Sequence, residues 1–139
     1  MRLSTARRIF SAVHRANRKG LLQACHDLSE GGLAVAAAEM AIAGSHGLEI
    51  DVRNLPVTAS GLAGSTGLFA ESPTRFLLEV TPVDAPVLEK ILGRTPHARI
   101  GRVLDSPRLR VWSNGGVVID AAIDILRSRW QAPLAEVAR

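Results

Sequence analysis

A run of small residues limits the folds that this chain can adopt. Residues 32–43 read GLAVAAAEMAIA, and only one of them, Glu39, is charged. The apolar residues follow the spacing of an α-helix, with one face made of Leu33, Ala36, Ala37, Met40 and Ala41. Because alanine side chains are short, such a helix can approach a sheet or a second helix very closely. The sequence therefore predicts a tightly packed helix over this run.

Helical and strand patterns alternate along the rest of the chain. Further helices are expected at 4–19, 84–93 and 121–130, with the last one ending near Trp130. Strands are expected at 21–25, 47–53, 75–82, 98–104 and 108–113, and the Asn114-Gly115 pair indicates a hairpin into another strand. The Gly- and Ser-rich stretch 54–68 is expected to be a loop with one short helix. This order predicts an α+β fold, with a mixed or antiparallel sheet and helices packed on one face.

Composition excludes several classes of protein. Aromatic residues make up 4% of the 139 residues and apolar residues 47%, so the core must be aliphatic. Cys25 is the single cysteine, which rules out an internal disulfide and a thiol-rich zinc site and suits a cytoplasmic setting. No run is apolar enough to indicate a signal peptide or a membrane span. The net charge of +4 comes from scattered arginines without interleaved aromatics, so no nucleic-acid partner is expected.

The segment His26-Asp27-Leu28-Ser29-Glu30-Gly31-Gly32 precedes the small-residue helix and allows two interpretations. By local pattern, Asp27 and Glu30 form a capping box, with Ser29 as another cap. Alternatively, a strand leading through glycines into a helix start leaves free backbone N–H groups that suit a phosphate. Asp27 at the strand end could then hold a magnesium ion. Because adjacent strand residues point to opposite faces, a catalytic pair of His26 with Asp27 is not expected.

A second polar cluster contains Glu71, Ser72 and Arg75 and stands before a predicted strand. Arg75 could face a phosphate or carboxylate at the edge of a pocket. A surface ion pair between Arg75 and Glu71 is the favoured interpretation of the pattern. Trp112 and Trp130 show no binding pattern and are expected to cover the edge of a small core.

Several segments resemble the C-terminal end of the synthetase region of phosphoribosylformylglycinamidine synthase, also called formylglycinamide ribonucleotide amidotransferase. They are HDLSEGGLAVAAAEMAIAG, GLEIDV, GLFAESPTRFLLEV, ARIGRV and VIDAAIDILRSRW. The resemblance extends from about Ser4 to Trp130, and weaker forms of the first motif occur across the aminoimidazole ribonucleotide synthetase-like superfamily. It implies that 1–132 form a partial C-terminal domain of that fold, followed by a frayed tail at 133–139.

The resemblance also implies a function. The family is an ATP-dependent C–N ligase that makes formylglycinamidine ribonucleotide from formylglycinamide ribonucleotide and glutamine-derived ammonia, in purine biosynthesis. Carried over by motif, Asp27 contacts magnesium and Ser29 contacts ATP or ADP at an auxiliary site, in the intact enzyme only. Glu30 stands where the family commonly has Asp. Glu71 and Ser72 match a substrate-holding segment only by internal symmetry, so no catalytic residue is assigned.

The resemblance places the catalytic histidine and the ATP-contacting lysine of the family in sequence outside this chain. We therefore expect a fragment, a split product or a truncated reading frame that is catalytically silent alone. Its partners would be the rest of the synthetase, in the same chain or as a subunit, and a glutaminase subunit or domain, with no membrane partner. Two alternatives stay open: a stand-alone module that pairs with a separate partner through its sheet, and a small-molecule kinase of the same superfamily.

Overall fold

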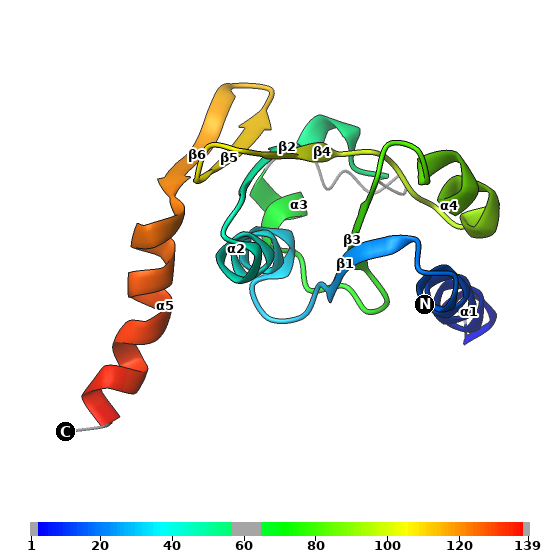
Figure 1. Ribbon diagram of the computed structural model, residues 1–139, viewed down its shortest axis with the longest axis horizontal. Coiled ribbons are helices and arrows are strands. Elements are labelled where there is room, and N and C mark those ends of the chain that lie inside the picture. Colours follow the sequence, from blue (N-terminus) through cyan, green and yellow to red (C-terminus); the bar gives the residue numbers. More distant parts are fainter. Residues whose placement is uncertain (1–2, 57–64, 138–139) are drawn as a thin grey trace.

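The structure is a computed structural model that describes residues 3–56 and 65–137 (Figure 1). The helices are α1 (Leu3–Arg18), α2 (Gly32–Gly44), α3 (Ser65–Phe69), α4 (Ala85–Leu92) and α5 (Ile123–Val137), with a 3₁₀ turn η1 (Val52–Asn54). The strands are β1 (Leu22–Asp27), β2 (Gly47–Asp51), β3 (Phe76–Val80), β4 (Gly101–Leu104), β5 (Arg108–Ser113) and β6 (Gly116–Ala122). This order confirms the predicted α+β fold. Of the predicted loop at 54–68, residues 57–64 lie outside the described residues.

The strands form two sheets. β1 and β3 make an antiparallel pair, and the other four strands form a sheet in the order β4-β2-β5-β6. Within the larger sheet, β2 and β5 are parallel and the other two pairings are antiparallel. The predicted mixed sheet is therefore confirmed.

Helix α2 packs against the inner face of the larger sheet. The strands alternate, so that Ile50 of β2 and Val111 of β5 point inward and are buried, 1% and 0% exposed. Ala37 of α2, also 0% exposed, belongs to the same core. The core is closed by Leu28, Leu33, Leu68, Leu109 and Ile123. As the small-residue pattern predicts, short alanine side chains bring this helix close to the sheet.

The outer face of the larger sheet carries charges instead. One row across the strands β4, β2, β5 and β6 consists of Arg102, Glu49, Arg110 and Asp120, which are neighbours in register. The signs of the charges alternate along the row. Arg102 forms an ion pair with Glu49 at 3.1 Å, and Arg110 forms one with Asp120 at 3.6 Å. Opposite charges directly across strands attract, so these pairs stabilise the face as a polar surface.

Helices α1 and α4 cover the smaller sheet at the other end of the molecule (Figure 1). A second cluster of buried residues joins Ala16, Leu21 and Leu88, with Leu22, Leu78 and Val80 packed against it. Gly20, with φ of +68°, reverses the chain after α1. The second cluster fixes α1 and α4 to β1 and β3.

Two predictions about the C-terminal part are wrong. The last helix does not end near Trp130 but continues through Pro133 to Val137. A proline removes one helical hydrogen bond, yet the helix-forming residues around it maintain the helical backbone. The tryptophans also do not cover a core edge: Trp112 is 37% exposed on the outer sheet face, and Trp130 is 54% exposed on α5. The first turns of α5 contact α2, and the rest of the helix projects away from the fold (Figure 1).

The close packing of α2 predicts a strong size limit at Ala37. Ala37→Leu adds a branched side chain where no surface is exposed, and we expect it to lower the free energy of unfolding by about 1–3 kcal/mol. The control is Ala43→Leu on the exposed side of the same helix. Urea denaturation measures both, and equal midpoints for the two variants would contradict the packing described.

Candidate functional site

The two polar clusters of the sequence meet at one end of the smaller sheet. Asp27, the last residue of β1, is in register with Phe76, the first residue of β3. The segments 28–31 and 70–75 therefore leave the sheet side by side, and the Leu28 N–H donates to the Arg75 carbonyl at 3.0 Å. Antiparallel pairing thus brings together two motifs that are distant in the sequence. Gly31 and Glu71, for example, are 40 residues apart.

A cavity of about 440 Å³ lies elsewhere on the fold, and one of about 370 Å³ lies between these two segments. The smaller cavity is lined by Phe10, Asp27, Leu28, Ser29, Glu30, Glu71, Ser72, Pro73, Thr74, Arg75 and Phe76. Asp27, Ser29 and Glu30 of the first cluster thus border the same space as Glu71, Ser72 and Arg75 of the second. Phe10 and Phe76 stack edge to face at 5.9 Å and form its apolar wall.

Glu71 caps the start of α2 across the cavity. Its Oε1 accepts the Gly31 N–H at 2.9 Å, and Gly31 is the N-cap residue. No side chain of the Asp27–Glu30 segment makes a capping hydrogen bond. The capping-box prediction is therefore wrong, because Asp27 still belongs to β1 and the helix begins only at Gly32. Glu71 places a negative charge near the positive end of the helix dipole instead.

The glycines at the helix start serve packing. Gly31 and Gly32 have φ of +74° and +60°, which side-chain-bearing residues rarely adopt. A Cβ on Gly32 would lie 2.7 Å from the Leu68 carbonyl oxygen, so its absence lets α2 approach α3. The N–H groups of Gly31 and Gly32 already donate, to Glu71 and to the Ser29 carbonyl. These two groups are therefore not among the free N–H groups that the sequence predicts at the helix start.

Arg75 supports the site by holding backbone. Its guanidinium donates to the Ala70 carbonyl at 2.8 Å and to the Gly67 carbonyl at 3.3 Å. Partial burial lowers the pKa of Arg75 below its ordinary value. No ion pair joins Arg75 to Glu71 in the described residues, so the predicted surface pair is wrong, and the guanidinium is already engaged rather than aimed at an anion.

The side chains of His26 and Asp27 do not form a hydrogen-bonded pair. The His26 Nε2 lies 3.1 Å from a carboxylate oxygen of Glu39 on α2, whereas the Asp27 side chain is 65% exposed. The shortest distance between the two side chains, His26 Nδ1 to Asp27 Oδ1, is 3.8 Å. This is too long for a hydrogen bond, so the pair lacks the geometry of a general base with its orienting acid.

The cavity is chemically suited to a cation held with a phosphate. Three carboxylates, those of Asp27, Glu30 and Glu71, border it, and its one arginine is bonded to backbone. A bare anion would be repelled there, whereas a divalent ion accepts one or two carboxylates together with phosphate oxygens. In the part of the chain that the structure describes, no group of three or more His, Cys, Asp or Glu residues could hold a metal ion by itself.

Comparison with known families identifies the domain. Residues 3–114 match the family described as AIR synthase related protein, C-terminal domain. The chain belongs to this family. None of the helices in the described segments has the length and apolarity needed to cross a membrane.

The similar proteins include phosphoribosylformylglycinamidine synthase subunits PurL. The chain is 35% identical over 136 residues to that of Alkaliphilus metalliredigens and 34% identical over 120 residues to that of Thermoplasma acidophilum. These matches cover 96% and 85% of the chain but only 18% and 16% of the relatives. The chain thus spans less than a fifth of their length.

Solved structures share the fold. Thermotoga maritima PurL complexed with ATP superposes with a TM-score of 0.77 at 21% identity, covering 86% of this chain and 21% of that one. Escherichia coli HypE, a hydrogenase maturation protein, superposes with a TM-score of 0.65 at 20% identity, covering 81% of this chain and 37% of that one. At these identities the superpositions establish the fold of the AIR synthase-related domain and nothing further.

The Glu71 cap predicts a specific loss of stability. Glu71→Ala removes the acceptor of the Gly31 N–H, and we expect it to lower the free energy of unfolding by about 1 kcal/mol. Glu30→Ala is the control, since Glu30 borders the same cavity without a hydrogen bond to the described residues. Urea denaturation compares the two, and a Glu71 variant no less stable than the Glu30 variant would show that the cap contributes nothing.

Proposed function

We propose that this chain is the C-terminal part of the synthetase region of a phosphoribosylformylglycinamidine synthase. The supporting observation is sequence identity of 35% and 34% to PurL subunits over most of the chain. The intact enzyme would use ATP and glutamine-derived ammonia to convert formylglycinamide ribonucleotide into formylglycinamidine ribonucleotide, in cytoplasmic purine biosynthesis. The fold alone does not identify this activity, because a hydrogenase maturation protein shares the fold.

Within that enzyme we assign two contacts to this chain. Asp27 would bind magnesium, since its exposed carboxylate lies at the strand end on the acidic cavity. Ser29 would contact ATP or ADP from the same cavity, since its hydroxyl is exposed and forms no hydrogen bond with the described residues. Bound magnesium would supply the positive charge that lets phosphate oxygens lie beside these carboxylates. The chain's own part would be to present the Asp27 carboxylate and the Ser29 hydroxyl just before the start of α2.

The remaining role of the chain would be structural. We assign no catalytic residue to it and expect no turnover from the chain alone. Residues 1–132 would form the domain proper and 133–139 its tail, of which residues 133–137 continue helix α5 and do not fray as expected. The partners would be the rest of the synthetase, as the same chain or another subunit, and a glutaminase subunit or domain. A separate interaction module would have the same sheets but no dependence on Asp27.

A chimera tests this proposal. The chain replaces the matching 136-residue segment of the 35% identical PurL of Alkaliphilus metalliredigens, and ATP-dependent product formation with ammonia is measured. We expect activity in the chimera and none in the chain alone. In the chimera, Asp27→Asn should raise the concentration of magnesium-ADP that half-saturates the auxiliary site at least tenfold, because a carboxylate ligand is lost.

The control for the chimera is Asp105→Asn, in an exposed turn away from the cavity. It should leave both activity and nucleotide binding unchanged. A monodisperse chimera that melts cooperatively but forms no product would contradict the proposed function. An active chimera in which Asp27→Asn and Asp105→Asn bind magnesium-ADP equally would instead contradict only the role of Asp27.

A further inference from the structure

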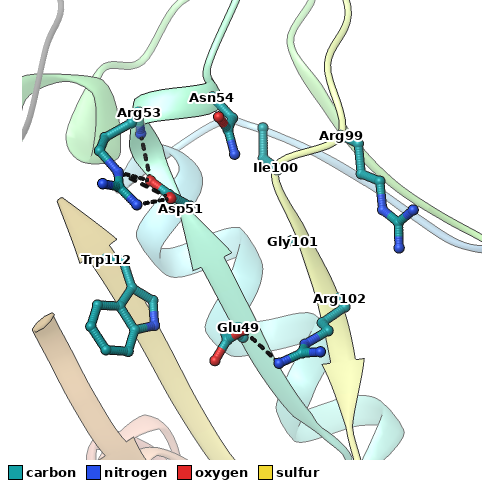
Figure 2. A pocket seen from close by; sticks show the side chains of 9 residues that line it. All are labelled: Glu49, Asp51, Arg53, Asn54, Arg99, Ile100, Gly101, Arg102 and Trp112. Atoms are coloured by element: carbon teal, nitrogen blue, oxygen red, sulfur yellow. Dashed lines mark hydrogen bonds and ion pairs between the residues drawn. The ribbon is translucent and has the colours of Figure 1, made fainter.

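The larger cavity, of about 440 Å³, lies on the charged outer face of the four-stranded sheet (Figure 2). It shares no lining residue with the cavity at Asp27. The side chains that matter for its chemistry are those of Glu49, Asp51, Arg53, Arg99, Arg102 and Trp112. Its size is in the range of small-molecule sites, which are commonly about 300–1,000 Å³.

Two ion pairs line this cavity. The Arg53 side chain binds both oxygens of Asp51, with Nε at 2.8 Å and 3.0 Å, and its own N–H donates to Oδ1 at 3.0 Å. These bonds hold the pKa of Asp51 below its ordinary value. On the opposite wall Arg102 contacts Oε1 of Glu49 at 3.1 Å.

The cavity carries an excess of positive charge. Three arginines face two carboxylates, and Arg99 forms no ion pair or hydrogen bond with the described residues. Arg99 and Arg102 lie on the β4 side, whereas Trp112 lies on the β5 side (Figure 2). A guanidinium group binds phosphate oxygens through two parallel N–H donors, so this side of the cavity is suited to a phosphate.

Trp112 supplies a flat apolar surface on the other side. It is in register with Asp51 on β2 and with Val117 on β6, and 37% of it is exposed. An indole held at a sheet surface offers its face to another planar ring, as aromatic side chains do for nucleic-acid bases. Here the ring would lie across the cavity from the two arginines.

We propose that this cavity binds a planar aromatic ring that carries a phosphate, with a nucleoside monophosphate as the representative ligand. The ring would stack on Trp112, the phosphate would bind Arg99 and Arg102, and the Glu49 carboxylate would accept a ribose hydroxyl. Because Arg99 adds a positive charge that no carboxylate of the cavity compensates, binding needs no metal ion. This separates the site from the acidic cavity at Asp27, and the inference does not depend on the proposed function.

Tryptophan fluorescence tests the site. The chain has two tryptophans, so Trp130→Phe leaves Trp112 as the single reporter. We expect saturable quenching by AMP in the presence of EDTA, with adenosine and inorganic phosphate each binding at least tenfold more weakly. Arg99→Ala and Arg102→Ala should each raise the AMP Kd about tenfold or more, whereas Asp27→Asn should leave it unchanged.

Arg110→Ala is the matched control, because Arg110 lies on the same sheet face outside the cavity. Calorimetry with Trp112→Leu tests the stacking, and we expect the AMP affinity to fall about tenfold. No binding by the folded Trp130→Phe protein would overturn the proposal. Equal losses of AMP affinity in Arg110→Ala and Arg99→Ala would also overturn it. Inorganic phosphate that binds as tightly as AMP would do the same, since each result would indicate only a general attraction for anions.

Discussion

The close approach of α2 to its surroundings is the constraint on which the rest of the fold depends. This helix contacts strands of both sheets as well as α3 and α5. Short side chains make that possible, since Ala36, Ala37 and Ala41 are at most 2% exposed. Larger residues would push the sheets apart, because protein interiors are packed without room for added volume. The positions of both sheets are therefore set by one helix of small residues.

The candidate site follows from where this helix begins. β1 leads directly into the turn before α2, so the motif residues stand between a paired strand and a packed helix. Two glycines with positive φ bring the helix start against α3, and Glu71 closes the same junction from the other segment. The acidic character of the cavity arises from this arrangement. The charged outer face of the sheet, by contrast, is independent of α2 and gives its cavity the opposite charge.

Local patterns predicted most of the elements. The 3.6-residue period of the small-residue helix and the alternation of Leu48 and Ile50 with Glu49 and Asp51 are properties of short windows, and the structure confirms both. The hairpin at Asn114-Gly115 is predicted equally well, because two residues determine its turn type. The motif residues could be found for the same reason, since they are contiguous.

What the sequence could not predict depends on contacts between distant segments. Nothing near Glu71 indicates that its carboxylate accepts the N–H of an N-cap residue 40 positions earlier, and the local pattern of Asp27 and Glu30 favoured a capping box instead. The sequence also does not predict the partners of Arg75, because its acceptors are backbone carbonyls, which have no signature in sequence. The exposed position of Trp112 on the outer sheet face depends on the register of β5 with β2, which a short window does not contain. Each of these errors concerns a tertiary contact rather than an element.

The junction of the two motif segments through Glu71 can be observed directly at the Gly31 amide. We would compare its proton resonance by NMR, at one fixed pH, in the unchanged chain, in Glu71→Ala and in the control Glu30→Ala. If Glu71 accepts this N–H, the amide signal should move clearly upfield in Glu71→Ala, because the acceptor is lost, and should stay in place in Glu30→Ala. An amide signal that is unmoved in Glu71→Ala, or that moves equally in both variants, would contradict the junction and the account of the site built on it.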